Sequence, residues 1–449
     1  MPKSLSGGPR RSYAIPLLVL AVAAAGFNLR TAITSLPPLF PDLQTRLHLS
    51  SAALSLLAAT PVICFGVVSA FAAWLNRRFG EEAILLVALG VLTAGLLLRG
   101  AAPGILLFPG TALAASAIAI LNVLLSSMVK RRWPERAGFG IGIYLTALSV
   151  GAILSSLISV PLYRSSGGSV RLALGLWAAP AALATLLWLP QLRYRAAGAG
   201  RAVPISGPTP APARVKVYKH ALAWQVMAFM GLQSLIYYAA LSWLPTIFQD
   251  RGTSAVTAGN LLALMGVGNL AAALVVPMLA HRAPDQRALV VPSMTAMGVG
   301  LAGSLWAPVG GAWLWVLVLG LGQGACLALA IFFMMARAPD PGAAASLSAF
   351  AQSAGYLVAS AGPLELGLLH TATGSWNIPL TLLLVLCGCG LVVGIFAARP
   401  LVLTLRGTNR ARRACRRPGP RRELSEHRSR RLGSFVDRQA RTADEEQST

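Results

Sequence analysis

Residues 191–219 read QLRYRAAGAGRAVPISGPTPAPARVKVYK, and this stretch decides how the chain is organised. It is the one long gap between apolar blocks in the interior of the chain, and its Gly, Pro and Arg content is typical of a flexible linker. Six apolar blocks precede it and six follow it. A helix needs about 20 mostly apolar residues to cross the hydrocarbon core of a bilayer, and the blocks are about this long.

We place the twelve blocks at residues 13–37, 52–75, 83–99, 105–129, 137–163, 170–190, 220–248, 256–280, 288–307, 312–336, 344–370 and 376–398. They are continuously apolar and lack the period-two alternation of outer-membrane strands, which favours helices over a barrel. We therefore predict an all-α polytopic membrane protein with twelve transmembrane helices in two pseudo-symmetric six-helix bundles. The predicted parts are an N-terminal bundle (1–190), a cytoplasmic linker (191–219), a C-terminal bundle (220–398) and a basic, disordered cytoplasmic tail (399–449).

The composition excludes a soluble enzyme of this length. Of the 449 residues, 55% are apolar and only 12% are charged, about half the charged fraction of a typical soluble protein. The mean hydropathy is +0.66. The same apolar content excludes intrinsic disorder for most of the chain.

The basic residues predict the orientation in the membrane. The net charge is +24, and fourteen of the 38 Lys and Arg residues lie in the tail. With both termini in the cytoplasm, the inner segments before the tail hold 18 basic residues, and the outer loops hold five, namely Arg46, Arg99, Arg164, Arg171 and Arg251. This bias predicts cytoplasmic N- and C-termini. The tail would also suit nucleic acid, but we expect it to lie near anionic lipid headgroups and to bind no nucleic acid.

The two halves repeat each other. The segment LPPLFPD at 36–42, which closes the first block, parallels LPTIFQD at 244–250, which closes the seventh. Arg77-Arg78 after the second block answers His281-Arg282 after the eighth, and Pro134-Glu135 answers Pro339-Asp340. A duplicated unit with a central linker is the architecture of an alternating-access carrier, whose site lies near the membrane midplane between the halves.

Two charged residues fall inside the apolar blocks, and both are candidates for function. Arg30 lies about 26 Å of helical rise from Tyr13, with polar Asn28, Thr31 and Thr34 around it. Its guanidinium stays charged and suits carboxylate-like or linear oxyanion groups; the alternative is a structural side chain that reaches outward or bonds backbone carbonyls. Glu365 lies at a comparable depth, and three roles stay open for it: a salt bridge to Arg30, a proton-coupling carboxylate, or a residue near the outer surface.

Uncharged polar residues inside the blocks add further candidates. In the repeat register Arg30 corresponds to Tyr238, so we expect an asymmetric cavity with its positive charge on the N-terminal half. Any one of these residues has helix-to-helix bonding as its default role, but together they would suit a small polar ligand. The predicted substrate-binding set is Arg30, Asn28, Thr34, Asn122, Tyr144, Gln233, Tyr237, Tyr238, Gln323, Gln352 and Tyr356, and the coupling or gate set is Glu365, Arg77 and Arg78.

Motifs for cofactors and catalysis are missing from the sequence. Gly138-x-Gly140-x-Gly142 and Gly320-x-Gly322-x-Gly324 follow no strand, so they favour close helix packing over dinucleotide binding. No P-loop, G-x-S-x-G or H-E-x-x-H motif is present, and the five histidines share no metal spacing. We expect no cofactor, no catalytic residue and no metal.

Several motifs together resemble the major facilitator superfamily, and within it the bacterial cyanate/nitroimidazole transporter branch. They are Asn28-Leu29-Arg30 with Pro37-Pro38-Leu39, Thr60-Pro61 to Gly66, Asn122-Val123-Leu124-Leu125, Val129 to Arg136 (VKRRWPER), Gln233-Ser234-Leu235 with Trp243-Leu244-Pro245, Gly320-Leu321-Gly322-Gln323-Gly324, Ala351 to Tyr356 (AQSAGY), Gly362-Pro363 and Thr373-Gly374-Ser375-Trp376. The resemblance covers nearly all of 28–398. It implies a rocker-switch carrier in the bacterial inner membrane, in which Arg30 and Asn28 face the substrate.

The chain also departs from the superfamily pattern. The loop after the second block reads AWLNRRFGEE at 73–82 in place of the usual acidic and basic motif, so the charge network at the inner gate must differ. The antiporter motif survives only as Gly142 and Gly151, and Glu365 stands where an apolar residue is expected.

The sequence thus predicts a secondary active transporter that moves a small polar or anionic, cyanate-like solute by alternating access, with Arg30 contacting the substrate. The expected partners are that solute and the bilayer, and the chain is expected to act as a monomer. Efflux of small nitroheterocyclic or drug-like compounds is one alternative, with the tyrosines as main contacts. A polytopic membrane enzyme is the other.

Overall fold

The computed structural model describes residues 14–132, 137–198 and 217–403, and within these ranges the chain is helical with short connections. Its transmembrane helices are α1 (Ala14–Thr34), α3 (Ser51–Phe79), α4 (Glu81–Ala101), α5 (Pro103–Arg132), α6 (Ala137–Ser165), α7 (Val170–Gly175) with α8 (Ala178–Gly198), α9 (Ala221–Asp250), α10 (Ala255–Arg282), α11 (Arg287–Trp306), α12 (Ala312–Ala336), α13 (Pro341–Ala359) with α14 (Ala361–Thr373), and α15 (Asn377–Ala397). Short segments are η2 (Pro37–Leu39), α2 (Phe40–Leu47), η5 (Val217–Lys219) and η6 (Val309–Gly311).

All twelve predicted blocks are helical, and two of them are split. Eleven helical segments of the described chain are long and apolar enough to cross a membrane. The block at 344–370 is divided between α13 and α14, because Pro363 has no N–H to bond the carbonyl of Ala359, where α13 ends. The block at 170–190 is divided between α7 and α8, and α8 continues to Gly198, into the predicted linker. The rest of that linker up to residue 216, and the tail from 404, lie outside the described residues.

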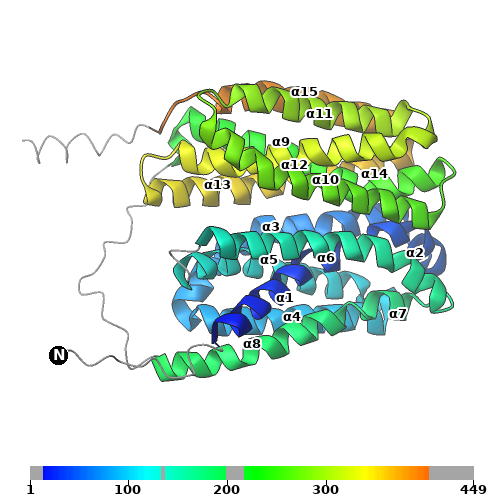
Figure 1. The fold of residues 1–449 in the computed structure, drawn as a ribbon. Coiled ribbons are helices and arrows are strands. Elements are labelled where there is room, and N and C mark those ends of the chain that lie inside the picture. The colour runs from blue at the N-terminus through cyan, green and yellow to red at the C-terminus, as the bar shows by residue number, and fades with distance from the viewer. Residues whose placement is uncertain (1–13, 133–136, 199–216, 404–449) are drawn as a thin grey trace, which may run out of the picture. The chain divides into compact units, whose positions relative to one another are not determined.

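The helices form two groups that follow the chain order. Helices α1 to α8, here called the N-terminal half, lie together, and α9 to α15, the C-terminal half, lie beside them (Figure 1). We call the end of the molecule that carries α2 the α2 end, and the opposite end, where α8 ends and α9 begins, the linker end. The repeated segments meet across the halves at the α2 end, where the rings of Phe40 and Trp243 are 5.6 Å apart.

The halves contact each other from the α2 end to the middle of the molecule. Gly367 of α14 packs against Ser55 of α3, and Gly259 of α10 packs against the carbonyl of Ser156 in α6. In the described part of the chain, hydrogen bonds between the halves run from Gln249 to Pro38 and from Arg30 to Tyr237. These contacts close the α2 end of the interface.

Glycines allow the closest helix contacts, and the predicted run from Gly320 to Gly324 behaves in this way. A Cβ atom on Gly320 or Gly324 would lie 2.2 or 2.1 Å from a carbonyl oxygen of α10. Gly390 and Gly394 pack against side chains of α9 and α11. Gly142 is different, because no atom lies within 4 Å of where its Cβ would be. The prediction of close packing at Gly142 is therefore wrong.

Arg99 is the clearest correction to the predicted loops. The hydropathy pattern places it in an outer loop, but its side chain is fully buried in α4. Its Nη1 donates to the carbonyl of Ala32 at 2.7 Å, and its Nη2 to Ser35 Oγ at 3.4 Å. A cation there stabilises the unpaired carbonyls and the negative dipole end of α1. Arg99 thus holds the last turn of α1, the helix that carries Arg30.

Candidate functional site

Arg30 lies at the contact between the two halves. Its Nη1 donates a hydrogen bond of 3.0 Å to Tyr237 Oη, and its Cζ lies 5.2 and 5.6 Å from the ring centroids of Tyr237 and Tyr238. Both tyrosines belong to α9, in the opposite half. Among the described residues no carboxylate pairs with Arg30. The phenol and the aromatic faces stabilise the cation only partly, because neither carries a negative charge that would neutralise it.

A small cavity adjoins Arg30. Its volume of about 10 Å³ is close to what one water molecule needs. Its lining comprises Arg30, Gln233, Ser234, Tyr237, Tyr238, Asn269, Gln323, Leu327 and Tyr356. Arg30 carries the one formal charge in this lining, so the cavity favours an anion or a strongly polar solute.

Aromatic rings enclose the cavity on the side of α3, α9 and α13. Phe65 meets Tyr356 at 5.7 Å and Tyr238 at 6.3 Å, and Tyr237 meets Tyr238 at 5.1 Å, all edge to face. Phe65 comes from the N-terminal half and the tyrosines from the C-terminal half. The cluster therefore joins the halves just beside Arg30, and it presents flat apolar surface to a ligand.

The predicted amides have different surroundings. Asn122 Oδ1 accepts a bond of 2.8 Å from Tyr144 Oη within the N-terminal half. Gln233 donates to Ser234 Oγ at 2.7 Å and to the carbonyl of Met230. Gln323 is 1% exposed, and neither its Nε2 nor its Oε1 has a partner. Gln352 lies one turn nearer the linker end of α13 than Tyr356, is half-buried, and does not line the cavity.

Asn28 and Thr34 do not join Arg30 in the cavity lining. Asn28 Nδ2 donates to the carbonyls of Ala24 and Pro180, so this side chain faces α8. Thr34 bonds the Arg30 carbonyl and Ser155 on α6, and it is 1% exposed. The resemblance implied that Asn28 and Arg30 form a substrate-facing pair, and the structure does not bring their side chains together. Asn269 of α10 lines the cavity instead, although the sequence analysis did not select it.

A second, larger hollow opens on the side of the N-terminal half. It has a volume of about 780 Å³ and lies between α1, α6 and α8, with Asn28 and Thr146 among mostly apolar side chains such as Phe27, Phe139 and Leu183. Gly26 and Gly151 press α1 directly onto α6, against Tyr144 and Phe27. This lateral groove carries no charged side chain among its lining residues.

Of the three roles left open for Glu365, the salt bridge to Arg30 is not formed in the structure. Glu365 is exposed on α14, and in the described part of the chain it has no ion-pair partner. Arg30 bonds Tyr237 instead. Of the two predicted gate arginines, Arg78 is exposed and lies over the ring of Phe79, and the side chain of Arg77 lies outside the described residues.

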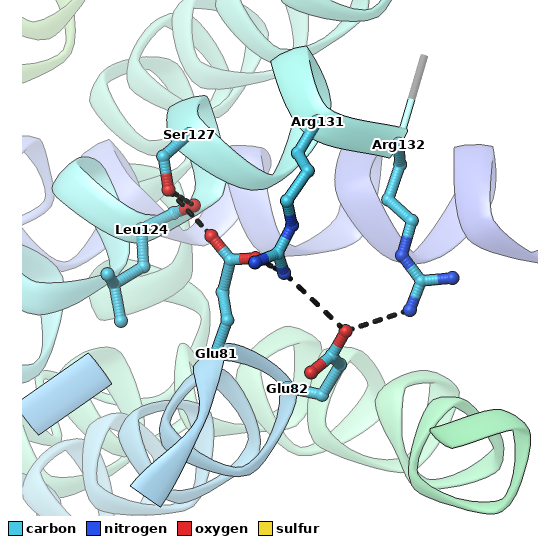
Figure 2. A network of polar contacts seen from close by, with 6 residues as sticks. All are labelled: Glu81, Glu82, Leu124, Ser127, Arg131 and Arg132. Carbon is cyan, nitrogen blue, oxygen red and sulfur yellow. Dashed lines mark hydrogen bonds and ion pairs between the residues drawn. The ribbon is translucent and has the colours of Figure 1, made fainter. Parts of the chain in front are cut away.

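A charge network at the linker end joins α4 to α5 (Figure 2). Glu81 accepts hydrogen bonds from Arg131 and, at 2.6 Å, from Ser127 Oγ. Glu82 accepts from Arg132 at 2.8 Å and lies 3.7 Å from Arg131. The two acids are residues at which the loop departs from the superfamily pattern, and here they pair with Arg131 and Arg132. The sequence feature that indicates this network is the pair of acidic residues at the start of α4 together with the run of basic residues at the end of α5.

The C-terminal half has a counterpart to this network at Arg337. Its Nη2 donates to Gln286 Oε1 at 2.7 Å and to the carbonyl of Ala398 at 2.8 Å, and its Nε donates to Ala397. It therefore joins the ends of α11, α12 and α15. The hydropathy pattern predicts an ordinary loop residue at Arg337, but in the structure this residue is buried, with 4% of its surface exposed.

Comparison with known proteins places the chain in a family. The family model described as Major Facilitator Superfamily matches residues 18–363. The chain belongs to this superfamily. It is 34% identical over 400 residues to the 2-nitroimidazole transporter of Escherichia coli (strain K12), covering 88% of this chain and 98% of the relative. It is 30% identical over 360 residues to the cyanate transport protein CynX of the same organism, covering 80% and 91%.

The fold of this superfamily member agrees with solved relatives. A D-xylose-proton symporter aligns with a TM-score of 0.69 at 16% identity, covering 88% of this chain and 99% of the other. A bacterial homologue of the lysosomal transporter Spinster aligns with a TM-score of 0.68 at 17% identity, covering 88% and 98%. The predicted fold class is confirmed, and the chain is a multi-pass membrane transporter. The membrane-enzyme alternative is therefore wrong.

Proposed function

We propose that this protein is a secondary active transporter that moves a small polar or anionic solute by alternating access, with Arg30 contacting the solute in the cavity between the halves. The observation that carries this proposal is the guanidinium of Arg30, which lines an inter-half cavity without a carboxylate partner. An unpaired charge inside a membrane protein costs free energy, which an incoming anion offsets. Similarity to a cyanate transport protein supports the same solute class.

We further propose that the two six-helix halves, 1–190 and 220–398, move as units joined by the linker. The excess of basic residues supports a cytoplasmic position for the linker end and both termini. The α2 end then faces outward, and the structure corresponds to a state closed on that side. Both halves of the cavity belong to one chain, so a monomer suffices.

A second candidate is efflux of small nitroheterocyclic compounds. The rings of Tyr237, Tyr238 and Tyr356 line the cavity and suit a planar solute, and one relative is named a 2-nitroimidazole transporter. In this case the aromatic cluster, more than Arg30, supplies the affinity.

Solute counterflow in proteoliposomes tests the proposal. Vesicles loaded with unlabelled cyanate or 2-nitroimidazole are expected to take up the labelled form of the same compound transiently, because a carrier exchanges its solute across the membrane without net energy input. Empty liposomes and vesicles loaded with sucrose serve as controls. Uptake no faster than in empty liposomes for both compounds would contradict the proposal.

A further inference from the structure

Gln323 holds a primary amide that nothing in the described protein satisfies. The side chain is 1% exposed, and its Nε2 and Oε1 both lack hydrogen-bond partners. A buried amide offers two donors and one acceptor oxygen, and leaving such groups unpaired is costly, so an unpaired buried amide needs an explanation. Gln233 on α9 also lines the cavity, but its amide donates hydrogen bonds to Ser234 and Met230 and therefore needs no such explanation.

The position of Gln323 is fixed by its neighbours in α12. A Cβ atom on Gly322 would lie 2.4 Å from the backbone nitrogen of Met297 in α11, and one on Gly324 would lie 2.1 Å from the carbonyl oxygen of Asn269 in α10. The backbone of α12 is thus seated against both neighbouring helices immediately before and after Gln323. Since the helix cannot turn to pair the amide within its own half, the amide is held facing the cavity.

Gln323 and Arg30 line the same cavity from opposite halves. Arg30 offers only donors, whereas the amide of Gln323 offers donors and an acceptor. Resting on the transport function proposed above, we infer that Gln323 selects the solute: it binds solutes that carry a hydrogen-bond donor beside an acceptor, while Arg30 holds an electron-rich group at the other end. An N–H heterocycle or a carboxamide satisfies both residues. Cyanate has acceptors only, and it leaves Oε1 of Gln323 unpaired.

This arrangement gives a sharp form of selectivity. A site that hydrogen-bonds a polar group of its substrate rejects an analogue without that group strongly, because the buried protein group is left without a partner. The same reasoning applies to the protein without solute. Replacing Gln323 by Met removes an unsatisfied amide and retains similar volume, so the unliganded protein becomes no less stable.

The test is a binding cycle by calorimetry on purified full-length protein. The probes are 2-nitroimidazole, in a buffer acidic enough to keep its ring N–H, its N-methyl derivative without that donor, and cyanate. We expect Gln323→Met to weaken 2-nitroimidazole binding roughly tenfold to a hundredfold and to weaken binding of the other two probes clearly less, because they can bond only the Nε2 donors of the amide. Gln44→Met, an exposed glutamine of α2, is the matched control, and Gln323→Asn retains a shortened amide if the Met variant misfolds.

The outcomes separate this inference from the proposed function. Equal weakening of all three probes by Gln323→Met, or no weakening of any, would overturn the selective role of Gln323 while leaving the transport proposal intact. A clear fall in the melting temperature of the unliganded Met variant would also overturn it, because the amide would then have a structural partner. Failure of the wild-type protein to bind any of the three probes would overturn the proposed function as well.

Discussion

We expect Arg30→Gln to weaken solute binding severely and to abolish counterflow while the protein stays folded in the membrane. The guanidinium is the one formal charge lining the inter-half cavity, and charge-assisted hydrogen bonds there are stronger than those in water. Removing one partner of a buried charged interaction costs about 3 kcal/mol or more, which corresponds to a loss of roughly 100-fold in affinity. Calorimetry and counterflow with cyanate and 2-nitroimidazole measure this loss.

Two further variants show whether the loss of affinity depends on the position of the charge and on the shape of the guanidinium. Arg171→Gln removes the same charge from an exposed position at the start of α7, and we expect it to bind and transport like the wild type. Arg30→Lys keeps the charge but loses the planar, forked donors, and we expect an intermediate affinity. Undiminished flux through the Arg30→Gln variant would remove Arg30 from the mechanism.

Gly324→Ala sharply lowers the stability of the C-terminal half. The added methyl group would lie 2.1 Å from the carbonyl oxygen of Asn269, and neither backbone has a rotamer with which to move aside. Helices α10 and α12 must separate, and overpacking of this kind costs about 3 kcal/mol. Thermal unfolding of purified protein in detergent, followed by near-ultraviolet circular dichroism, gives the change.

Gly142→Ala is the matched control for this prediction. It makes the same substitution in α6, where no atom lies within 4 Å of the new methyl group. Because alanine favours a helix over glycine, we expect an unchanged or slightly raised melting temperature. Equal melting temperatures for the Gly324 and Gly142 variants would show that α10 and α12 do not approach each other as closely as described.

The sequence predicts the helices well because a bilayer imposes one simple requirement. Each span must bury its backbone bonds within itself and present apolar side chains to lipid, and twelve such blocks were correctly located. What it misses is local. The burial of Arg99 depends on tertiary contacts, and hydropathy reads an arginine near a helix end as a loop residue. The break at Ser360 comes from Pro363, which the hydropathy of an apolar block does not register.

For the candidate site, the sequence indicates the level of each residue along its helix, but not the neighbouring helix toward which its side chain points. Asn28 and Arg30 lie at nearly the same level of α1, yet two residues turn a helix by about 200°, so Asn28 faces α8 while Arg30 faces α9. The phenolic counterpart of Arg30 came from the repeat register, and Tyr238 does lie beside it. Asn269 carried no signal beyond its polarity, because only the packing of α10 on α12 brings it to the cavity.

The most direct measurement is the location of bound solute in an experimental structure of the protein with 2-nitroimidazole or cyanate. The cavity beside Arg30 and the apolar groove of the N-terminal half differ in character, so the position of the ligand decides between them. We predict density between the halves, within hydrogen-bond distance of the Arg30 guanidinium. Density confined to the apolar groove between α1, α6 and α8, with Arg30 still bonded only to Tyr237, would contradict the account.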